Sequence, residues 1–459
     1  MKTKNNLAIV KALAVGLLLA SAASLAAENS DVAAASAASS SAEATDLQPL
    51  IDATPAGETL TLEKGRTYAG PAVIAKAITL RSDGTATLTN ESDDPVLTVA
   101  ADGVVLRDLL VRDSKKDAKK PAILLQSDRN RIEGVDIVTQ AGGIFLRDAD
   151  DNVLRNNRIQ GASAGGSRKA AYSKRGNGID LFASSGNVIE GNTLIRVHDG
   201  VYAESSEGTK VRGNKAVDSR YGFHFMFSGK PELKGNVGEG NVTGGMVMGV
   251  EGAVVTDNRF AKQTENVNSQ GILLFDVHRS EISRNRVEGN RVGFYVENST
   301  ENELAGNEIA SNFIGLQMIR SESNSFKNSA FLSNVIQAQA SESKDNLLHG
   351  NYWDDNGGID ANGDGYSDMS YDIDPFFLQL TKDVEAFQVF FQSPGLPFLA
   401  QMFHSDTSNW LRDREPLMSP PDWQARAGSD DGLWLTFAAG ILLLFASIFT
   451  FYRWGYRKS

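Results

Sequence analysis

A repeat of 22 residues in the middle of the chain is the feature that most restricts its fold. Four glycines share this spacing: Gly178, Gly200, Gly222 and Gly244. Four asparagines share it too, each 14 residues after one of the glycines: Asn192, Asn214, Asn236 and Asn258. Each glycine opens a short apolar run. Such a period, with two or three strand-like runs per unit, is typical of a β-solenoid whose coils stack on one another. The predicted fold class is therefore all-β, a right-handed parallel β-helix.

The register of each coil follows from the alternation of side chains along a strand, which point in turn to opposite faces. Counted from the repeat glycine, the first and third residues are apolar in most coils. They include Ile179 and Leu181, Phe223 and Phe225, Ile272 and Leu274, and Phe294 and Val296. We expect these side chains to fill the interior of the solenoid.

The second and fourth positions, which should face outward, carry soft metal ligands in two successive coils. They are His224 and Met226 in one coil and Met246 and Met248 in the next. Neighbouring parallel strands lie about 4.8 Å apart, so the four side chains should form one patch. Imidazole and thioether ligands suit copper(I). Methionine is also a common core filler, and a strand that started at Gly245 would turn both methionines inward.

The segment that carries the histidine also resembles a known family. Residues 220–228 read Arg-Tyr-Gly-Phe-His-Phe-Met-Phe-Ser and resemble the RYGxHxMYS segment of the NosD family, periplasmic maturation proteins of nitrous oxide reductase. The similarity extends over most of the chain after its leader, including residues 47–62, 68–71 and 351–354. The first and last of these segments recur in many β-helical proteins of the carbohydrate-binding and sugar-hydrolase type, so they indicate the fold. The His/Met segment is the specific part.

The resemblance implies an accessory protein of denitrification rather than an enzyme. It implies partnership with a copper chaperone (NosL), an ABC permease (NosY) and an ATPase (NosF), which together supply nitrous oxide reductase (NosZ) with copper or complete its copper–sulfur cluster. The sequence contains no P-loop, so any ATP hydrolysis would belong to a partner. The competing interpretation is a polysaccharide lyase, epimerase or hydrolase, for which Asp180, Glu204 and Arg220 are the only candidates near the patch.

Charge and composition narrow the compartment and the partners. The 459 residues carry a formal net charge of −12, which argues against a nucleic-acid partner. There is no cysteine, which excludes disulfides and any cysteine-based zinc or haem site. A chain without thiols also fits an oxidising compartment, where thiols would be oxidised or would compete for copper.

The chain divides by composition into five segments. Residues 1–27 are predicted to be a signal peptide and 28–46 an Ala/Ser-rich linker. The β-helix is expected over 47–376, with a helical turn at 47–53 covering its first coil. Residues 377–429 are rich in aromatic residues and proline and are predicted to dock a partner or a membrane surface, or else to pack on the solenoid.

The last segment, 430–459, contains 20 residues without a charge, 433–452, enough to cross a bilayer. Basic residues follow this stretch, which predicts a cytoplasmic C-terminus. The predicted location is therefore the periplasm, anchored to the inner membrane by the C-terminal helix.

A second candidate metal site follows the last coil. The oxygen-bearing residues of this acidic loop have the spacing of the first part of an EF-hand: Asp360, Asn362, Asp364, Tyr366 and Asp368. Position 12 is Tyr371, which cannot supply the bidentate carboxylate, so Asp372, Asp374 or Asp354 would have to replace it. The loop is predicted to hold a structural calcium ion, or to be an acidic turn without one.

Irregular spacings and further asparagines complete the pattern. Surplus residues in 161–177 and 262–268 predict insertions that bracket the His/Met coils. Asparagines continue at 285, 307, 328 and 351. We expect the repeated asparagines to tolerate left-handed backbone at one corner and to hydrogen-bond along a stacked ladder.

Overall fold

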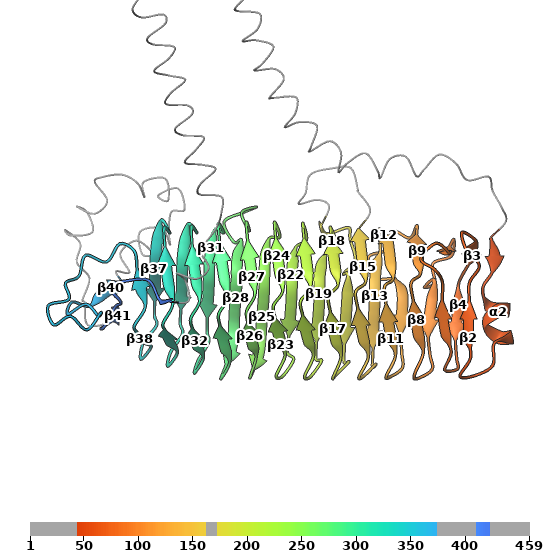
Figure 1. Ribbon diagram of the computed structural model, residues 1–459, viewed down its shortest axis with the longest axis horizontal. Helices are drawn as coiled ribbons and strands as arrows, with labels where there is room; N and C mark the ends of the chain where they lie inside the picture. Colours follow the sequence, from red (N-terminus) through yellow and green to blue (C-terminus); the bar gives the residue numbers. More distant parts are fainter. Residues whose placement is uncertain (1–43, 162–171, 374–409, 423–459) are drawn as a thin grey trace, which may run out of the picture. The chain divides into compact units, whose positions relative to one another are not determined.

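The computed structural model describes residues 44–161, 172–373 and 410–422. The chain divides into two units, Met1–Thr45 and Asp46–Ser459, and only the last two residues of the first unit are described. The second unit contains a parallel β-solenoid of the right-handed type, whose coils stack along one axis (Figure 1). Its strands form three sheets of 14, 12 and 15 strands, here named sheets A, C and B. The predicted fold class is confirmed.

In sheet A the strands follow the order β1 (Thr45–Asp46), β3 (Thr67–Ala69), β6 (Thr87–Asn90), β9 (Leu110–Asp113), β12 (Asp136–Thr139), β15 (Arg158–Gly161), β18 (Thr193–Ile195), β21 (Lys215–Val217), β24 (Val237–Glu239), β27 (Arg259–Ala261), β30 (Arg286–Glu288), β33 (Glu308–Ala310), β36 (Ala330–Leu332) and β39 (Tyr352–Trp353). In sheet C they are β4 (Ala72–Ile74), β7 (Leu97–Val99), β10 (Pro121–Leu125), β13 (Gly142–Arg147), β16 (Ile179–Phe182), β19 (Asp199–Glu204), β22 (Tyr221–Met226), β25 (Thr243–Glu251), β28 (Gln270–His278), β31 (Val292–Glu297), β34 (Ile314–Ile319) and β37 (Ile336–Ser341). In sheet B they are β2 (Thr59–Thr61), β5 (Thr79–Arg81), β8 (Val105–Arg107), β11 (Arg131–Glu133), β14 (Val153–Arg155), β17 (Val188–Glu190), β20 (Lys210–Arg212), β23 (Glu232–Lys234), β26 (Val254–Thr256), β29 (Glu281–Ser283), β32 (Glu303–Ala305), β35 (Ser325–Lys327), β38 (Leu347–His349), β41 (Leu411–Asp413) and β40 (Tyr371–Ile373).

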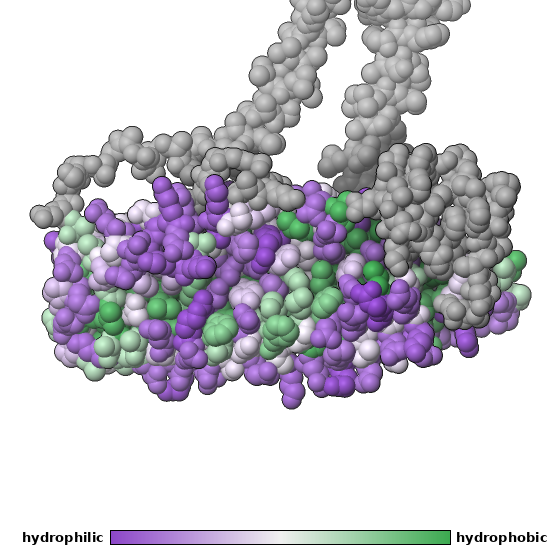
Figure 2. Space-filling model, turned by 180° about the vertical axis from the view of Figure 1, so that it is seen from behind, coloured by the Kyte–Doolittle hydropathy of each residue, from purple (hydrophilic) through white to green (hydrophobic). Residues whose placement is uncertain are grey.

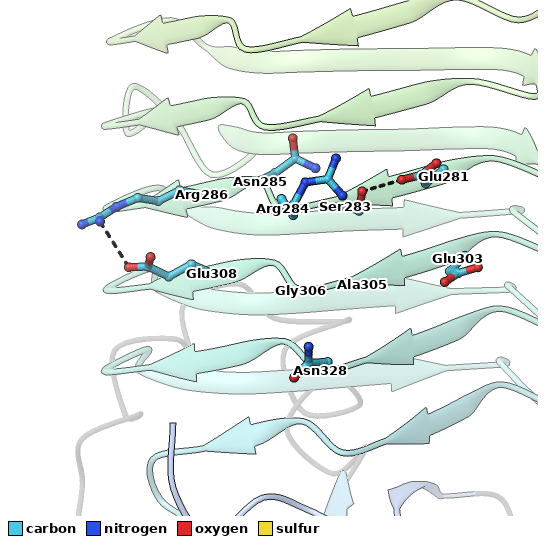
Figure 3. Close-up of a pocket in the computed structure, with 10 residues that line it drawn as sticks. All are labelled: Glu281, Ser283, Arg284, Asn285, Arg286, Glu303, Ala305, Gly306, Glu308 and Asn328. Atoms are coloured by element: carbon cyan, nitrogen blue, oxygen red, sulfur yellow. Dashed lines mark hydrogen bonds and ion pairs between the residues drawn. The ribbon is translucent and has the colours of Figure 1, made fainter. Parts of the chain in front are cut away.

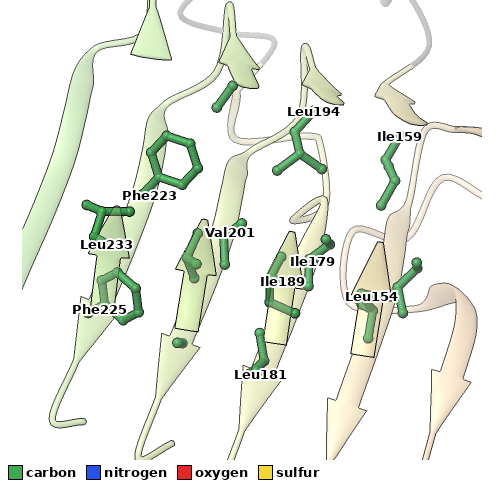
Figure 4. Close-up of a cluster of buried hydrophobic side chains, with 14 of the residues drawn as sticks. Leu154, Ile159, Ile179, Leu181, Ile189, Leu194, Val201, Phe223, Phe225 and Leu233 are labelled. Atoms are coloured by element: carbon green, nitrogen blue, oxygen red, sulfur yellow. The ribbon is translucent and has the colours of Figure 1, made fainter. Parts of the chain in front are cut away.

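The interior is a continuous stack of apolar side chains, one layer per coil. Figure 4 shows Ile179 and Leu181 of β16 and Phe223 and Phe225 of β22 pointing into it. The expected inward residues of four coils are at most 2% exposed, which confirms the register. Because each strand buries one face only, its outward positions remain free to carry other chemistry.

The asparagine ladder lies inside the corner between sheets B and A. The Asn214 amide N–H donates to the side-chain oxygen of Asn236 over 2.8 Å, and the amide N–H of Asn236 donates in the same way to Asn258. The ladder is therefore confirmed. The expected left-handed backbone is wrong for these asparagines, because the positive φ angles belong to the preceding residues, such as Gly213 and Gly235.

One member of the ladder was also placed wrongly. Asn328 has a positive φ and is exposed, while Ser329 accepts the hydrogen bond from the Asn307 amide. The neighbouring residue thus takes the inward position at this coil. A serine hydroxyl can replace an asparagine oxygen as acceptor because both side chains are short and polar.

Both described ends of the solenoid are covered. Helix α2 (Gln48–Ala53) buries Ile51 against the first coil, as predicted for residues 47–53. Its Gln48 side chain accepts from the Val73 amide over 2.7 Å and donates to the Val73 carbonyl over 3.2 Å, so it occupies the open edge of β4. At the other end β41 pairs in parallel with β38 and antiparallel with β40. Residues 410–422 of the C-terminal extension therefore pack on the last coils.

Several predicted segments lie outside the described residues: the signal peptide, nearly all of the linker, most of the extension, and the C-terminal anchor at 430–459. Asp374 lies outside them too. Among the residues that are described, no helix has the length and hydropathy needed to cross a membrane.

Candidate metal-binding site

The two coils with soft ligands stack in the predicted register. His224 of β22 is paired with Met246 of β25, and Met226 is paired with Met248. The residues between them, Phe225 and Val247, are each 1% exposed and face the core. The methionines are partly exposed on the outer face, so the alternative register with both of them inside is wrong.

His224 lies on the outer side of its strand but is only 5% exposed. The rings of Tyr202, in the preceding coil, and Tyr221, on the same strand, contact the imidazole edge-on, each with its centroid 5.0 Å away. The expectation of a solvent-facing imidazole is thus corrected. The ring is outside the core yet shielded by two aromatic side chains.

A buried ion pair holds the other side of the imidazole. Nδ1 of His224 lies 3.0 Å from Oδ2 of Asp199, a carboxylate with no exposed surface. Arg220 donates to both oxygens of Asp199, from Nε over 2.8 Å and from Nη2 over 2.6 Å. Burial opposes ionisation of Asp199, but the hydrogen bonds from His224 and Arg220 outweigh it and lower its pKa to about 2. Asp199 is therefore a carboxylate at neutral pH.

The second nitrogen of the imidazole has no partner. Nε2 of His224 is buried, and among the described residues no hydrogen-bonding group reaches it. Most buried polar atoms in proteins are hydrogen-bonded, so an exception calls for an explanation. A nitrogen ligand held ready for a metal ion provides one, because a soft ion would replace the missing partner.

The thioethers lie among side chains that differ from coil to coil. Sδ of Met226 is 3.9 Å from the hydroxyl of Tyr202, which donates to Glu204 over 2.6 Å. On the far side, Met246 and Met248 are followed in register by Leu273 and Phe275. At the two outward positions in register with His224 and Met226, soft donors thus occupy two successive coils, between a Tyr/Glu pair and an apolar pair.

Two hollows border this part of sheet C. One, of about 340 Å³, is lined by Tyr221, Thr243, Gln270 and Leu273 and by Asn266 and Val267 of the predicted insertion. The other, of about 290 Å³, lies towards the N-terminus and includes Phe145, Arg147, Arg175, Asp180 and His198. The described parts of both predicted insertions therefore flank the His/Met coils, as expected.

The carboxylates considered for an enzyme do not form one cluster. Asp180 pairs with Arg147 over 2.7 Å, Glu204 accepts from Tyr202, and Arg220 is bound to Asp199. Burial, together with the nearby Asp199 charge, raises the pKa of Asp180 despite its pairing with Arg147. No two of these three candidate residues are bonded to each other.

A larger hollow of about 560 Å³, beside strands of sheet B, also carries carboxylates and arginines (Figure 3). Several of them are paired. Arg286 lies 3.4 Å from Glu308, and the hydroxyl of Ser283 donates to Glu281 over 2.6 Å. Burial raises the pKa of Glu308. The Arg286–Glu308 pair joins two successive coils and the Ser283–Glu281 bond lies within β29, so these charges have structural partners.

The outer surface is not uniformly polar. The view from behind shows hydrophobic residues gathered in patches between hydrophilic ones (Figure 2). Near the His/Met coils, the side chains of Phe182 and Phe227 are 44% and 57% exposed. Exposed aromatic side chains of this kind are common where partners bind.

The acidic loop after the last coil is held by bonds to its own backbone. Asp360 accepts from the amides of Gly363 and Gly365, over 2.6 and 2.9 Å, and these bonds lower its pKa. Asp364 accepts from the side chain of Asn362 and the amide of Tyr366. Asp368 accepts from the Ala361 amide. This is a folded loop of the predicted kind.

The carboxylate that an EF-hand has at loop position 12 has no clear replacement among the described residues. Of the proposed replacements, Asp354 accepts from Ser333 and Gln337, and Asp372 lies 3.4 Å from Nε of Arg412. Over the described residues, no three His, Asp or Glu side chains are grouped as a ready ligand set. Calcium stays a prediction.

Sequence reasoning missed the residues that surround the histidine. Asp199, Tyr202 and Tyr221 belong to the site, although none was a candidate ligand. A signal was present for the carboxylate: Asp199 directly precedes a repeat glycine, where neighbouring coils have Asn177, Tyr221 and Thr243. A buried acid at this position requires a charged or hydrogen-bonding partner. Here the partners, Arg220 and His224, lie one coil away.

The described chain is thus a parallel β-solenoid with one imidazole and three thioethers on adjacent outer positions. Residues 166–363 match the family model NosD, described as a periplasmic copper-binding protein. This match, which spans less than half of the chain, and the solenoid together fit a NosD-like β-helix protein. A comparison with curated proteins finds no match.

Solved structures with a similar chain path include two epimerases and a lyase. The periplasmic alginate epimerase AlgG is 12% identical, covering 66% of this chain and 82% of its own, with a TM-score of 0.43. The A-module of the mannuronan epimerase AlgE6 from Azotobacter vinelandii is 13% identical, covering 66% and 88%, with a TM-score of 0.44. An alginate lyase from Paenibacillus is 19% identical, covering 59% and 94%, with a TM-score of 0.35.

Proposed function

We propose that this protein is a periplasmic accessory protein that binds copper(I) as cargo at His224, Met226, Met246 and Met248. The observation that carries the proposal is the buried, unpartnered Nε2 of His224, on a strand position paired with Met246. The match to a family described as periplasmic copper-binding supports the choice of metal.

The chemistry of the ligands suits transfer rather than storage. Thioethers and a neutral imidazole add no negative charge, so they bind copper(I) without the strong hold of thiolates. The charge of Asp199 is already balanced by Arg220. The protein therefore holds the ion by soft donors alone, and a partner with more or better donors can remove it.

Delivery would serve nitrous oxide reductase. We place this protein beside an ABC permease (NosY) and an ATPase (NosF), with NosL as copper donor and NosZ as acceptor, anchored to the inner membrane by residues 430–459. This set of partners follows from the resemblance of residues 220–228 to the NosD segment. In this arrangement the protein itself catalyses no reaction, and ATP hydrolysis by the partner would change its docking and gate release of the ion.

The structure gives the polysaccharide-enzyme alternative no support. An enzyme of that type needs an outward acid and base in one cluster. Here Asp180 is bound to Arg147, and Glu204 to Tyr202, on separate coils. We therefore propose one function only.

Copper(I) titration of the full-length chain tests the proposal. Wild type should bind one ion tightly, while the H224A/M226A double variant and the M246A/M248A double variant should each bind at least tenfold more weakly. Met369 is a matched control, because its side chain is 55% exposed and lies in the acidic loop. M369A should bind as wild type does.

The same variants should act in cells. A strain that carries H224A/M226A should keep normal amounts of the protein and yield copper-deficient nitrous oxide reductase. Equal copper(I) affinity in wild type and both double variants, with intact circular dichroism spectra, would overturn the proposal.

A further inference from the structure

We propose that Asp199 is a positioning residue that fixes the neutral ring of His224 with its proton on Nδ1. The lone pair of Nε2 then faces the outer patch as the nitrogen that receives metal. The metal part of this inference rests on the proposed function, whereas the position of the proton is a property of the metal-free protein.

The hydrogen bonds around Asp199 leave one choice for the proton. A carboxylate can only accept hydrogen bonds. Its Oδ1 accepts from Nε of Arg220 over 2.8 Å and from the Tyr221 amide over 3.4 Å, and its Oδ2 accepts from Nη2 of Arg220. Nδ1 of His224, 3.0 Å from Oδ2, must therefore be the donor. In a neutral ring the other nitrogen then carries no hydrogen.

Arg220 keeps the carboxylate in place. Its guanidinium binds both oxygens of Asp199 and lies over the ring of Tyr221, 4.3 Å from the centroid. Tyr221 in turn contacts His224. Rotation of Asp199 away from the imidazole would break both of its bonds to Arg220. The carboxylate therefore stays beside Nδ1 and does not replace a thioether as a metal ligand.

The surroundings of Nε2 favour a soft cation over a proton donor. The atom is buried and has no partner, and the edges of Tyr202 and Tyr221 enclose the ring. Met246, the next residue in register, offers a thioether and no strong hydrogen-bond acceptor. A carboxylate that orients a metal-binding histidine through its other nitrogen is a general arrangement, and losing it typically weakens binding 10- to 100-fold.

Replacing Asp199 by asparagine should move the imidazole proton of His224 from Nδ1 to Nε2. An amide –NH2 at the Oδ1 position would face two donors, the Arg220 Nε and the Tyr221 amide. At the Oδ2 position it would face one Arg220 donor and Nδ1 of His224, which can become an acceptor if the proton moves to Nε2. The second arrangement leaves fewer donors opposed. D199N should therefore place a hydrogen on the nitrogen that the metal needs.

The first measurement is the ¹⁵N NMR spectrum of the imidazole rings in the metal-free full-length chain, recorded over a range of pH. H224Q identifies the His224 signals by their disappearance. Wild type should show the proton on Nδ1 and D199N the proton on Nε2. The second measurement is copper(I) affinity, which should fall about 10- to 100-fold in D199N.

D180N is the matched control. Asp180 also lies in sheet C and is 7% exposed, but its partners are Arg147 and Asn177. D180N should leave both the His224 tautomer and the copper(I) affinity unchanged.

Each outcome decides something. A wild-type spectrum with the proton on Nε2 overturns the inference, and this result does not depend on whether D199N folds. A folded D199N with an unchanged tautomer and unchanged affinity also overturns it. If wild type shows the expected tautomer and yet binds no copper(I), the proposed function fails while the positioning role of Asp199 stands.

Discussion

The ladder asparagine Asn236 offers the sharpest test of what holds the solenoid together. Its side chain is fully buried. Its oxygen accepts from the amide and the side chain of Asn214, over 2.8 and 3.0 Å. Its nitrogen donates to the carbonyls of Val211 and Lys234 and to the side chain of Asn258. Asn236→Ala removes all five bonds and leaves buried groups of two neighbouring coils unpaired.

The expected loss of stability follows from the buried donors and acceptors that lose their hydrogen-bond partner. A buried donor or acceptor without a partner costs about 1–3 kcal/mol. The Asn214 amide and the Val211 carbonyl are the two most affected, and the loss of the remaining bonds adds to their cost. We expect Asn236→Ala to lower the free energy of unfolding by about 3–6 kcal/mol. Asn268→Ala, at an exposed residue, should change it by at most about 0.5 kcal/mol.

Urea unfolding followed by circular dichroism measures the difference. Coils of a solenoid contact only their neighbours, so part of the effect should be local. Hydrogen exchange should therefore show faster exchange of amides in β21, β24 and β27 than in distant coils. Equal unfolding midpoints for Asn236→Ala and Asn268→Ala, with no local change in exchange, would refute the view that the ladder bonds stabilise the corner.

Two further predictions concern ionised groups. The folded pKa of Asp199 is about 2, below its ordinary value of 3.8, so its ionised form stabilises the fold above pH 3.8 and this contribution is lost as the pH falls towards 2. The stability difference between wild type and D199N should therefore shrink by about 2 kcal/mol between pH 5 and pH 2, and a constant difference would contradict the ion pair. If the loop at Asp360 holds calcium, EGTA should lower the melting temperature of wild type but not of D360A, whereas equal melting with and without EGTA would count against the ion.

The fold was predictable because one period controls it. The spacing of Gly178, Gly200, Gly222 and Gly244 predicts where β16, β19, β22 and β25 begin, and the side-chain alternation then predicts which residues face inward. The same count predicts His224 beside Met246, as the strand pairing has it. Corner geometry was less accessible, since a one-residue shift decides whether Asn328 or Ser329 joins the ladder.

The environment of the site could not be predicted from the sequence pattern. Asp199 lies 25 residues before His224, and its importance depends on which way its carboxylate turns. The contacts of Tyr202 and Tyr221 with the imidazole likewise depend on how their side chains turn. Tyr202 lies two residues after a repeat glycine, the outward position that His224 also occupies, but whether two outward rings stand apart or close over each other depends on side-chain conformation, which the period does not specify.

Core packing explains why the methionines of β25 face outward. Where most coils place a large residue directly after the repeat glycine, this coil has Gly245. Phe260 of β27 is fully buried and occupies that space, since a side-chain carbon added at Gly245 would lie 3.2 Å from its ring. Turning Met246 inward would bring its thioether into volume that Phe260 already fills, and overpacking of this kind typically costs about 1–3 kcal/mol. The small residues at 244 and 245 and the phenylalanine at 260 therefore act together to hold the thioethers on the outer face, next to His224.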